Sequence, residues 1–415
     1  MVSGLAQSLI VGELRTGRRL LAVPVSACSW SLAAGSAGSI EATIPLRATD
    51  FRRMVQQSSG GLWPGGGAYP SPETFPSGAV TRWVPGDRTR GDIKGATEPT
   101  RTFAAVLVGD RVIEAGPIWA RSWDDAAGAL TIRAAGLQSV FDHRLVLRND
   151  IEWNAPFAIA RASLSWSGLS LGTIQKRLVQ TALAHTGGDL PVVLQADEAG
   201  PHTRTYPGAE MATVAQRLDE LSQVINGPEF AFEPRLTADR LGVEWVMRTG
   251  TLADPLLHQA GLDWVASATA SRGSIAGLTV TEDASSVATR AFAKGSGTDE
   301  ASVISRPAAR SDLLAAGFPL LESARSYSSV TEQATVDSHA AADLDANDRP
   351  WMTWSLSLAA DARLGQYRPG DWWQVRVGDH VYLDAGSYRA RLASIKGAFG
   401  SPTVDLGMVP VEVAG

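Results

Sequence analysis

The architecture is set by residues 103–136, FAAVLVGDRVIEAGPIWARSWDDAAGALTIRAAG. Their runs of apolar and β-branched residues are typical of strands. Gly109-Asp110 predicts a two-residue turn, because glycine adopts a positive φ at no steric cost, and Asp125–Gly128 predicts a second turn. The stretch therefore predicts two consecutive hairpins, and residues 136–147, GLQSVFDHRLVL, predict a short helix or turn that closes them.

Strand-like alternation also extends toward the N-terminus, over residues 5–46, with turns at Gly35 and Gly38. Within it, Arg18-Arg19 followed by LLAVPVSACSWSLAAGSA resembles a signal peptide with a lipoprotein-like cleavage box. Because Pro24, Ser26 and Cys28 interrupt the apolar run, we interpret this segment as a strand rather than as an export signal.

Residues 58–100 have a different character, since 15 of these 43 residues are Gly or Pro and no periodicity survives. Structureless segments of this length are uncommon within compact domains and are usually functional or mobile. We therefore interpret them as an arm inserted between strands. Its aromatic residues either contact a neighbouring protein or fold back onto their own domain. The candidate partner-contacting residues are Trp63, Tyr69, Phe75 and Trp83.

Helical periodicity begins after residue 152. Two segments each place apolar side chains on one face, the first ending at Gly187-Gly188 and the second at Gly227-Pro228. The apolar positions are Ile174, Leu178, Val179, Ala182 and Leu183 in the first segment, and Val214, Leu218, Leu221 and Ile225 in the second. The strand-like stretches FAFEPRL and LGVEWVMRTG follow, so this middle region is predicted to be α+β.

Strands return between residues 264 and 306, a helix is predicted over residues 332–347, and the remainder is again strand-like. The 415 residues are enough for two to four domains. We expect an N-terminal β module in residues 1–148 that carries the arm 58–100. The α+β portion takes residues 149–263 with about 307–347. A second β module takes residues 264–306 with 348–415.

Composition excludes several classes of protein. The net charge of −6 argues against a protein that grips nucleic acid, and the single cysteine, Cys28, excludes an intramolecular disulfide framework and a cysteine-rich zinc site. The six histidines never share an i, i+4 face, so no zinc ligand pattern is present. No stretch reaches the ~18 apolar residues of a membrane span. No cofactor motif is found, and the tryptophans favour packing over a binding platform.

Gly168–Gly172, GLSLG, matches the G-x-S-x-G pattern of serine hydrolases. His185, His202, His258 and Asp254 lie further along the chain, as a triad would require. The alternative is that Ser170 or Thr173 caps the helix that follows, and we favour it because the alternating strands and helices of a hydrolase are missing. Asp343–Asn347 resembles the start of a calcium loop but lacks its glycine and its final glutamate, so solvated acids at a helix end are expected instead.

Several stretches, in this order and spacing, resemble the tail-hub minor tail proteins of long-tailed actinobacterial phages, also called baseplate hub or tail-associated proteins. They are SWSLAAGSAGSIEATIPL, VIEAGPIWARSWDDAAGALTIRAAGLQSVFDHR, ATVAQRLDELSQVINGPEFAFEPRL, AAGFPLLESARSYSSVTEQATVDSHAAADL, RPGDWWQVRV and SYRARLASIKG. Together they cover most of the chain outside residues 58–100. The arm departs from the simplest hub pattern, which leaves its role open.

The resemblance implies a mainly β, α+β fold of the phage tail-hub type, in which two tube-like β-barrel modules flank an α+β portion. It further implies a homotrimer at the virion tail tip of a siphovirus, which presents six similar modules to a sixfold tail tube and lets DNA pass during infection. The implied partners are the distal tail protein ring, the tape measure protein and other minor tail or receptor-binding proteins. We expect no enzymatic activity and no hydrolase extension, because the last strand-like stretch ends close to Gly415.

Two alternatives remain at this stage. One is a tail-tip enzyme, either a serine hydrolase that uses Ser170 or a cell-wall hydrolase. The other is a carbohydrate-binding receptor protein that uses the aromatic residues of the arm.

Overall fold

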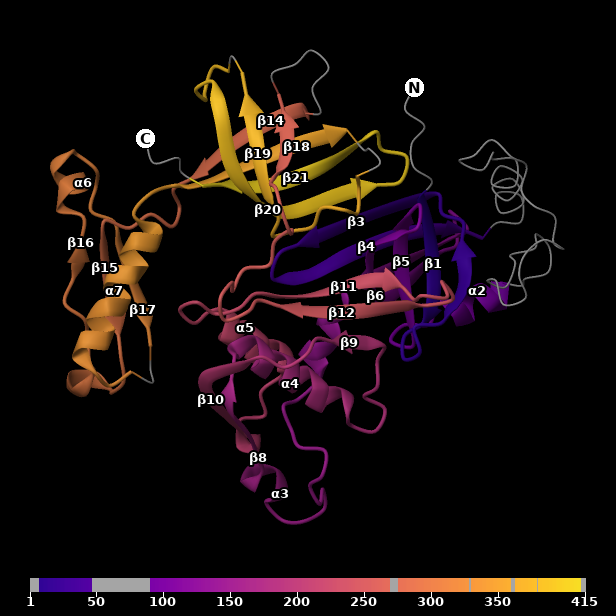
Figure 1. Ribbon diagram of the computed structural model, residues 1–415, viewed down its shortest axis with the longest axis horizontal. Helices are drawn as coiled ribbons and strands as arrows, with labels where there is room; N and C mark the ends of the chain where they lie inside the picture. The colour runs from indigo at the N-terminus through magenta and orange to yellow at the C-terminus, as the bar shows by residue number, and fades with distance from the viewer. Residues whose placement is uncertain are drawn as a thin grey trace. The chain divides into compact units, whose positions relative to one another are not determined.

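The computed structural model describes residues 7–46, 90–268, 275–327, 330–359, 363–378 and 380–411. The chain forms two compact units, one made of Met1–Gly277 with Leu356–Gly415 and the other of Leu278–Ser355. Figure 1 shows the ribbon, in which strands dominate the first unit. In the described residues, no helix is long and apolar enough to cross a membrane.

A 13-stranded sheet is the framework of the first unit. The boundaries between the two units fall inside two of its strands, β14 and β18. Its strands are β1 Gln7–Glu13, β2 Arg19–Val23, β3 Ala27–Ala33, β4 Ser36–Pro45, β5 Thr102–Val108, β6 Arg111–Asp124, β7 Ala129–Ala135, β13 Trp264–Ser267, β14 Ile275–Asp283, β18 Trp351–Ala359, β19 Trp372–Val377, β20 Gly386–Ala398 and β21 Thr403–Pro410.

The strand order is β14-β18-β21-β20-β3-β4-β7-β6-β5-β1-β2, and β13 joins through β19, which pairs with β20. The mainly β, α+β fold class predicted from the sequence is confirmed. The N-terminal and C-terminal strands belong to this one sheet, because β3 pairs antiparallel with the C-terminal half of β20. Within the described residues, the path does not return on itself to close a barrel.

The two hairpins of residues 103–136 form as predicted. β5 and β6 are joined by the turn at Gly109, whose φ is 59°, and β6 and β7 by the turn before Ala129. Every side chain of β5 is buried, because the sheet is covered there by a second layer. Trp245 of that layer meets Phe103 edge to face at 5.5 Å between ring centroids, and its Nε1 donates to the carbonyl of Ala115 at 2.9 Å.

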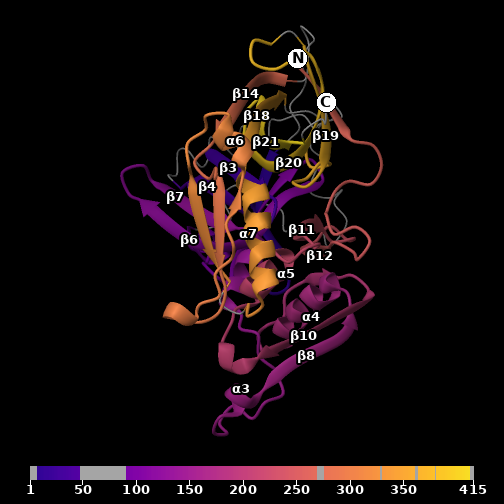
Figure 2. The ribbon, with the colours of Figure 1, turned by 90° about the vertical axis from the view of Figure 1, so that its left-hand side faces the viewer.

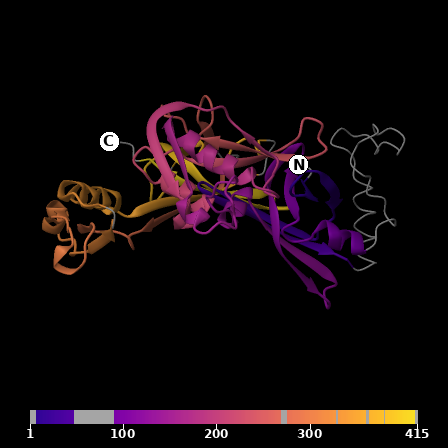
Figure 3. The same cartoon turned by 90° about the horizontal axis from the view of Figure 1, so that it is seen from below.

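The α+β layer of the first unit packs on β1, β5 and β6 of the sheet, and Figure 3 shows its magenta helices in front of the strands. Its strands are β8 Ser163–Leu169, β9 Val192–Leu194, β10 Ala199–Pro207, β11 Phe230–Leu236 and β12 Val243–Thr249. Its helices are α3 Ala158–Arg161, α4 Leu171–Leu183 and α5 Val214–Ser222, with 3-10 turns η2 Leu137–His143 and η3 Gly208–Glu210. Helix α2 Arg90–Ala96 lies instead beside the large sheet, where Arg121 of β6 donates to the carbonyl of Lys94. This helix corrects the expectation of a structureless arm for the end of residues 58–100.

Helices α4 and α5 bury the faces that their periodicity predicts, with one exception. Ile174, Leu178 and Leu218 lie in a single core cluster. Ile225, predicted to lie on the same face, is 92% exposed, because α5 ends at Ser222 and the chain turns outward before Gly227. The apolar pattern therefore extends the second helix too far.

The second unit is a small sheet with one helix packed on it, as Figure 2 shows for α7. Strand β15 lies between β16 and β17. Its elements are β15 Arg290–Lys294, η4 Asp299–Ala301, β16 Ala308–Ala309, α6 Ser311–Ala315, β17 Glu322–Ser326 and α7 Gln333–Asn347. Val336, Ala340 and Leu344 of α7 are buried against Ala291 and Ala293 of β15. Helix α7 forms over the residues predicted.

The large sheet contains the same strand path twice. The N-terminal module, defined as β1 and β3–β7, follows the order β3-β4-β7-β6-β5-β1. The C-terminal module, defined as β13, β14 and β18–β21, follows β14-β18-β21-β20-β19-β13. Thus β3 corresponds to β14, β4 to β18, and β5, β6 and β7 to β19, β20 and β21. The last strand differs in direction, since β1 is antiparallel to β5 while β13 is parallel to β19.

Local geometry supports this correspondence. β6 and β20 are the two longest strands of the sheet, and each has a bulge near its middle, at Ile118/Ala120 and at Leu392/Ser394. The residue before each bulge accepts an equivalent hydrogen bond, since Thr100 N donates to Ile118 O at 2.8 Å and Gly370 N donates to Leu392 O at 2.7 Å. Both donors have positive φ, 66° and 103°. The modules therefore match strand by strand and at their bulges.

Candidate functional site

The aromatic residues that the sequence singles out, Trp63, Tyr69, Phe75 and Trp83, lie outside the described residues. Their contact with a partner therefore stays a prediction. Other candidates from the sequence, namely the G-x-S-x-G pattern, the histidines and the acidic segment near Asp343, lie within described elements.

Ser170 is the N-cap of α4. Its Oγ accepts a hydrogen bond from Thr173 N at 3.2 Å, its side chain is buried, and its φ of −70° and ψ of 157° are ordinary extended values. A hydrolase nucleophile instead sits on a strained turn with its oxygen exposed. The helix also begins directly after β8, whose partner β10 is antiparallel. The geometry is that of a capping serine, which satisfies an otherwise unpaired N–H group of the helix.

The hydrogen bonds of the histidines do not lead to Ser170. His258 pairs through Nε2 with Asp254 Oδ2 at 2.8 Å and through Nδ1 with the carbonyl of Gln259. His185 Nε2 lies 3.0 Å from the carbonyl of Leu147. Among the hydrogen bonds of the described residues, these contacts assemble no serine–histidine–acid triad.

The acidic segment 343–347 is only partly solvated, since Asp345 is exposed as expected but Asp343 is not, which corrects the expectation from the sequence for Asp343. Asp343 is buried, and Tyr327 Oη donates to its carboxylate at 2.8 Å. Its position on the buried face of α7 explains the difference. In the part of the chain that the structure describes, no three His, Cys, Asp or Glu side chains converge as metal ligands.

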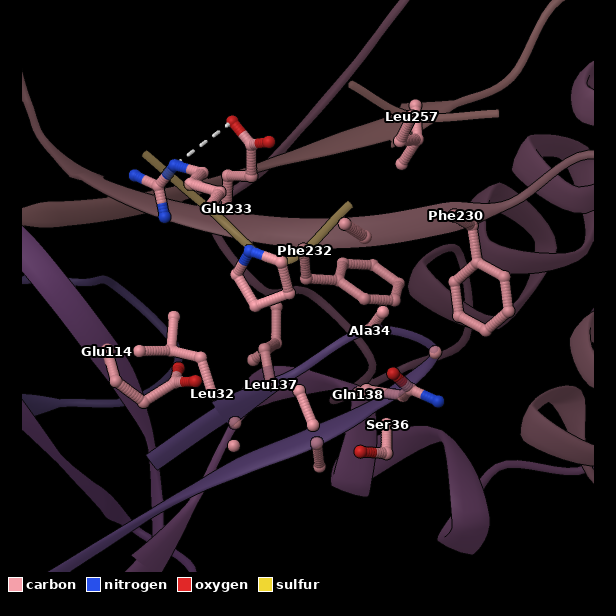
Figure 4. A pocket seen from close by; sticks show the side chains of 18 of the residues that line it. Leu32, Ala34, Ser36, Glu114, Leu137, Gln138, Phe230, Phe232, Glu233 and Leu257 are labelled. Carbon is pink, nitrogen blue, oxygen red and sulfur yellow. Dashed lines mark ion pairs between the residues drawn. The ribbon is translucent and has the colours of Figure 1, made fainter. Parts of the chain in front are cut away.

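The first unit has a small cavity where the β3–β4 turn, β11 and the segment before β19 meet, shown in Figure 4. The β3–β4 turn contributes Leu32, Ala34 and Ser36, and β11 contributes Phe230 and Phe232. Its volume is about 90 Å³, enough for a few water molecules and far below the 300–1,000 Å³ typical of ligand pockets. The cavity is therefore a junction between parts of the fold rather than a substrate pocket.

Glu114 of β6 is the buried ionisable group of this junction. Its Oε1 accepts from the backbone N of Ala115 at 2.8 Å, and its carboxylate fills the space that a side chain on Gly38 would need. Burial raises the pKa of Glu114 to about 7, against the hydrogen bond from Ala115 and the charge of Arg368, which lower it. A carboxyl group in this position is largely protonated in mildly acidic solution.

Two arginines of the C-terminal module tie it to β11. Arg391 of β20 forms an ion pair with Glu229 and donates to the carbonyls of Gly370 and Leu257 at 3.0 and 3.2 Å. Arg368 Nε lies 3.7 Å from Glu233 Oε2, the pair dashed in Figure 4. Both pairs are partly shielded from water, and Arg391 also donates to two carbonyls, so these contacts link the C-terminal part of the first unit to the segment around β11.

Sequence reasoning missed this junction. The sequence indicates it only through Glu114, a single glutamate in the apolar run VIEAG, because glutamate is rarely buried in a strand without a partner. The arginines gave no signal, because their partners are distant in sequence. The chemistry that the described site supports is packing and fixed orientation.

No protein-family model matches the sequence, and no curated protein matches it either. The fold, however, is shared with two solved tail proteins. The structure superposes on the 43 kDa tail protein of prophage MuSo2 from Shewanella oneidensis with a TM-score of 0.53, at 10% identity, over 97% of this chain and 96% of that one. It also matches the tail protein from Neisseria meningitidis MC58, with a TM-score of 0.52, at 13% identity, over 98% and 97% of the two chains.

Proposed function

We propose that this protein is a structural component of a phage tail, namely the hub at the tail tip of a long-tailed phage. The observation that carries the proposal is the strand path repeated in the N-terminal and C-terminal modules. The likeness to two tail proteins over nearly their whole lengths supports the same class of protein.

The repeated path gives a physical reason for a homotrimer. Three copies of a chain with two equivalent modules present six similar surfaces, so such a ring fits a sixfold tail tube above and a threefold tip below. Head-to-tail contacts between identical chains close into a ring when the rotation per subunit divides a full turn. The junction at Glu114, Arg368 and Arg391 would keep the two modules at that fixed angle.

The proposed neighbours are the distal tail protein ring above, the tape measure protein in the lumen, and other minor tail or receptor-binding proteins outside. Genomic DNA would pass through the ring without being held. The net charge of −6 supports this, because firm binding to DNA needs a basic surface that displaces counterions. The proposed location is the virion tail tip, after assembly in the host cytoplasm.

Native mass spectrometry of the full chain tests the proposal. The expected species is a trimer, at three times the chain mass of 43.8 kDa. A monomer or a hexamer in purified tail tips would contradict it.

A further inference from the structure

The contact between the modules within one chain suggests how two chains meet. Residues Ser394–Ala398 of β20 pair antiparallel with Ser29–Ala33 of β3. The same edge of β20 is occupied by β19 over residues 386–391, so β3 fills the half that β19 leaves free. In the repeated path, β6 is the counterpart of β20 and β14 is the counterpart of β3.

Among the described strands, the counterpart edges lack a second neighbour, and Arg121 beside the β6 edge donates to the carbonyls of Lys94 and Thr97. β5 pairs with residues 111–117 of β6, and beyond them no described strand other than β7 pairs with residues 120–124. β14 ends the sheet, with β18 as its one neighbour among the described strands. Figure 2 shows the β6–β7 hairpin extending out of the sheet. Unpaired edges of this kind are usually covered by another strand, since exposed N–H and C=O groups invite pairing.

A large and a small residue fix the register of the internal contact. Trp30 of β3 lies directly opposite Gly397 of β20, and a Cβ on Gly397 would lie 2.4 Å from the Trp30 ring. The edges of β6 and β14 also carry one tryptophan and one glycine, but here the tryptophan is on β6, the counterpart of β20, and the glycine is on β14, the counterpart of β3. Counting from the bulge, Trp123 is the counterpart of Gly397, and it is 48% exposed. On β14, a Cβ added to Gly277 would meet no described atom within 4 Å, and the φ of Gly277 is not positive.

We propose that β14 of one subunit pairs antiparallel with the C-terminal half of β6 of the next subunit, with Ala276–Val280 opposite Ala120–Asp124. In this register, Trp123 of one copy lies over Gly277 of another. The partner is a second copy of this chain, and repetition of the contact closes the ring. This inference rests on the proposed trimer. Three contacts of this kind between chains, together with the three β3–β20 contacts within the chains, would join six modules into a ring.

Disulfide trapping tests the pairing. Ser122 and Leu278 would be opposite each other at a position without direct backbone hydrogen bonds, where Cα atoms are ~4.5 Å apart and a disulfide fits. In the full chain carrying Ser122→Cys and Leu278→Cys, oxidation is expected to give covalent dimers and trimers that reductant dissolves. The control pairs Ser122→Cys with Ser163→Cys, an exposed position on β8 that the proposal leaves unlinked. Equal linkage in both variants would overturn the proposed register.

Two matched substitutions test the same contact without cysteines. Gly277→Leu is expected to abolish the trimer while leaving the unfolding midpoint of the chain unchanged, whereas Gly95→Leu, also in open space without positive φ, keeps it. Trp123→Ala is expected to weaken the trimer at least tenfold, and Trp153→Ala, at 49% exposure, to leave it intact.

The outcomes separate the two proposals. A trimer that forms without the disulfide and survives Gly277→Leu overturns this interface but leaves the hub function standing. A chain that stays monomeric contradicts both.

Discussion

Trp30 lies directly across from Gly397, near opposite ends of the chain, and its ring occupies the space where any larger residue would place a Cβ. The ring is 3% exposed. This contact joins the N-terminal and C-terminal modules into one sheet. Any side chain added at Gly397 is therefore expected to disturb the contact between the two modules.

Gly397→Val should destabilise the fold by about 2 kcal/mol or more, because overpacking forces Trp30 out of its rotamer or moves the strands apart. Gly386→Val on the same strand is the matched control, since a Cβ there meets a single atom, at 3.8 Å. Urea unfolding measures both. If the two variants unfold at the same urea concentration, the tight packing of Trp30 on Gly397 is not what joins the modules.

Glu114 should make stability depend on pH. Its pKa rises from the ordinary 4.5 to about 7 on folding, so between these values the folded chain holds a proton that the unfolded chain has lost. The free energy of unfolding should therefore fall as pH rises from 4.5 to 7, and this contribution should level off above 7, at a cost of about 3 kcal/mol.

Glu114→Gln keeps the acceptor for Ala115 N and removes the titration. Urea unfolding at a series of pH values should show a flatter profile for this variant than for the wild type between pH 4.5 and 7. Parallel profiles would show that Glu114 does not titrate in this range.

Ser170→Ala should cost about 1 kcal/mol of stability through loss of the α4 cap, and should change no esterase or cell-wall-degrading activity. Thr213→Ala removes the equivalent cap of α5, where Thr213 Oγ1 accepts from Gln216 N at 3.2 Å. Both variants should unfold with similar losses. A hydrolytic activity that disappears in Ser170→Ala but persists in Thr213→Ala would favour the tail-tip enzyme.

Replacement of Trp63, Tyr69, Phe75 and Trp83 together by alanine should leave the unfolding midpoint of the purified protein unchanged and reduce its incorporation into tails. The reason is that we assign these residues to contact with a partner. Calorimetry and immunoblots of purified tails measure the two effects. A lowered midpoint with normal incorporation would indicate that the arm folds back onto its own domain, and a selective loss of adsorption would favour a receptor-binding role.

Local patterns predicted local structure well. The turn at Gly109, the buried faces of α4 and α5, and the span of α7 follow from residue spacing alone. The end of α5 could not be predicted in this way, because Ile225 continues the apolar period into a segment that is no longer helical. Buried Asp343 was also missed, since its partner Tyr327 comes from another element.

Residue patterns alone do not predict the repeated strand path, and the resemblance to tail hubs implied two similar β modules without giving their strand order. β6 and β20 share geometry without sharing residues, as RVIEAGPIWARSWD and GSYRARLASIKGA show. The equivalent hydrogen bonds come from Thr100 in one module and Gly370 in the other, because backbone groups make them and any residue able to reach positive φ serves. The two modules therefore share their strand order and these backbone hydrogen bonds, although their side chains differ.

The proposed hub depends above all on two equivalent modules per chain building a six-module ring from three chains. Cryo-electron microscopy of the assembled tail, with this chain's symmetry resolved, is the decisive measurement. We expect threefold symmetry at the tip, with six similar β modules around a lumen that the N-terminal and C-terminal modules line in alternation. A ring of six identical chains, or density for this chain away from the tip, would contradict the proposal.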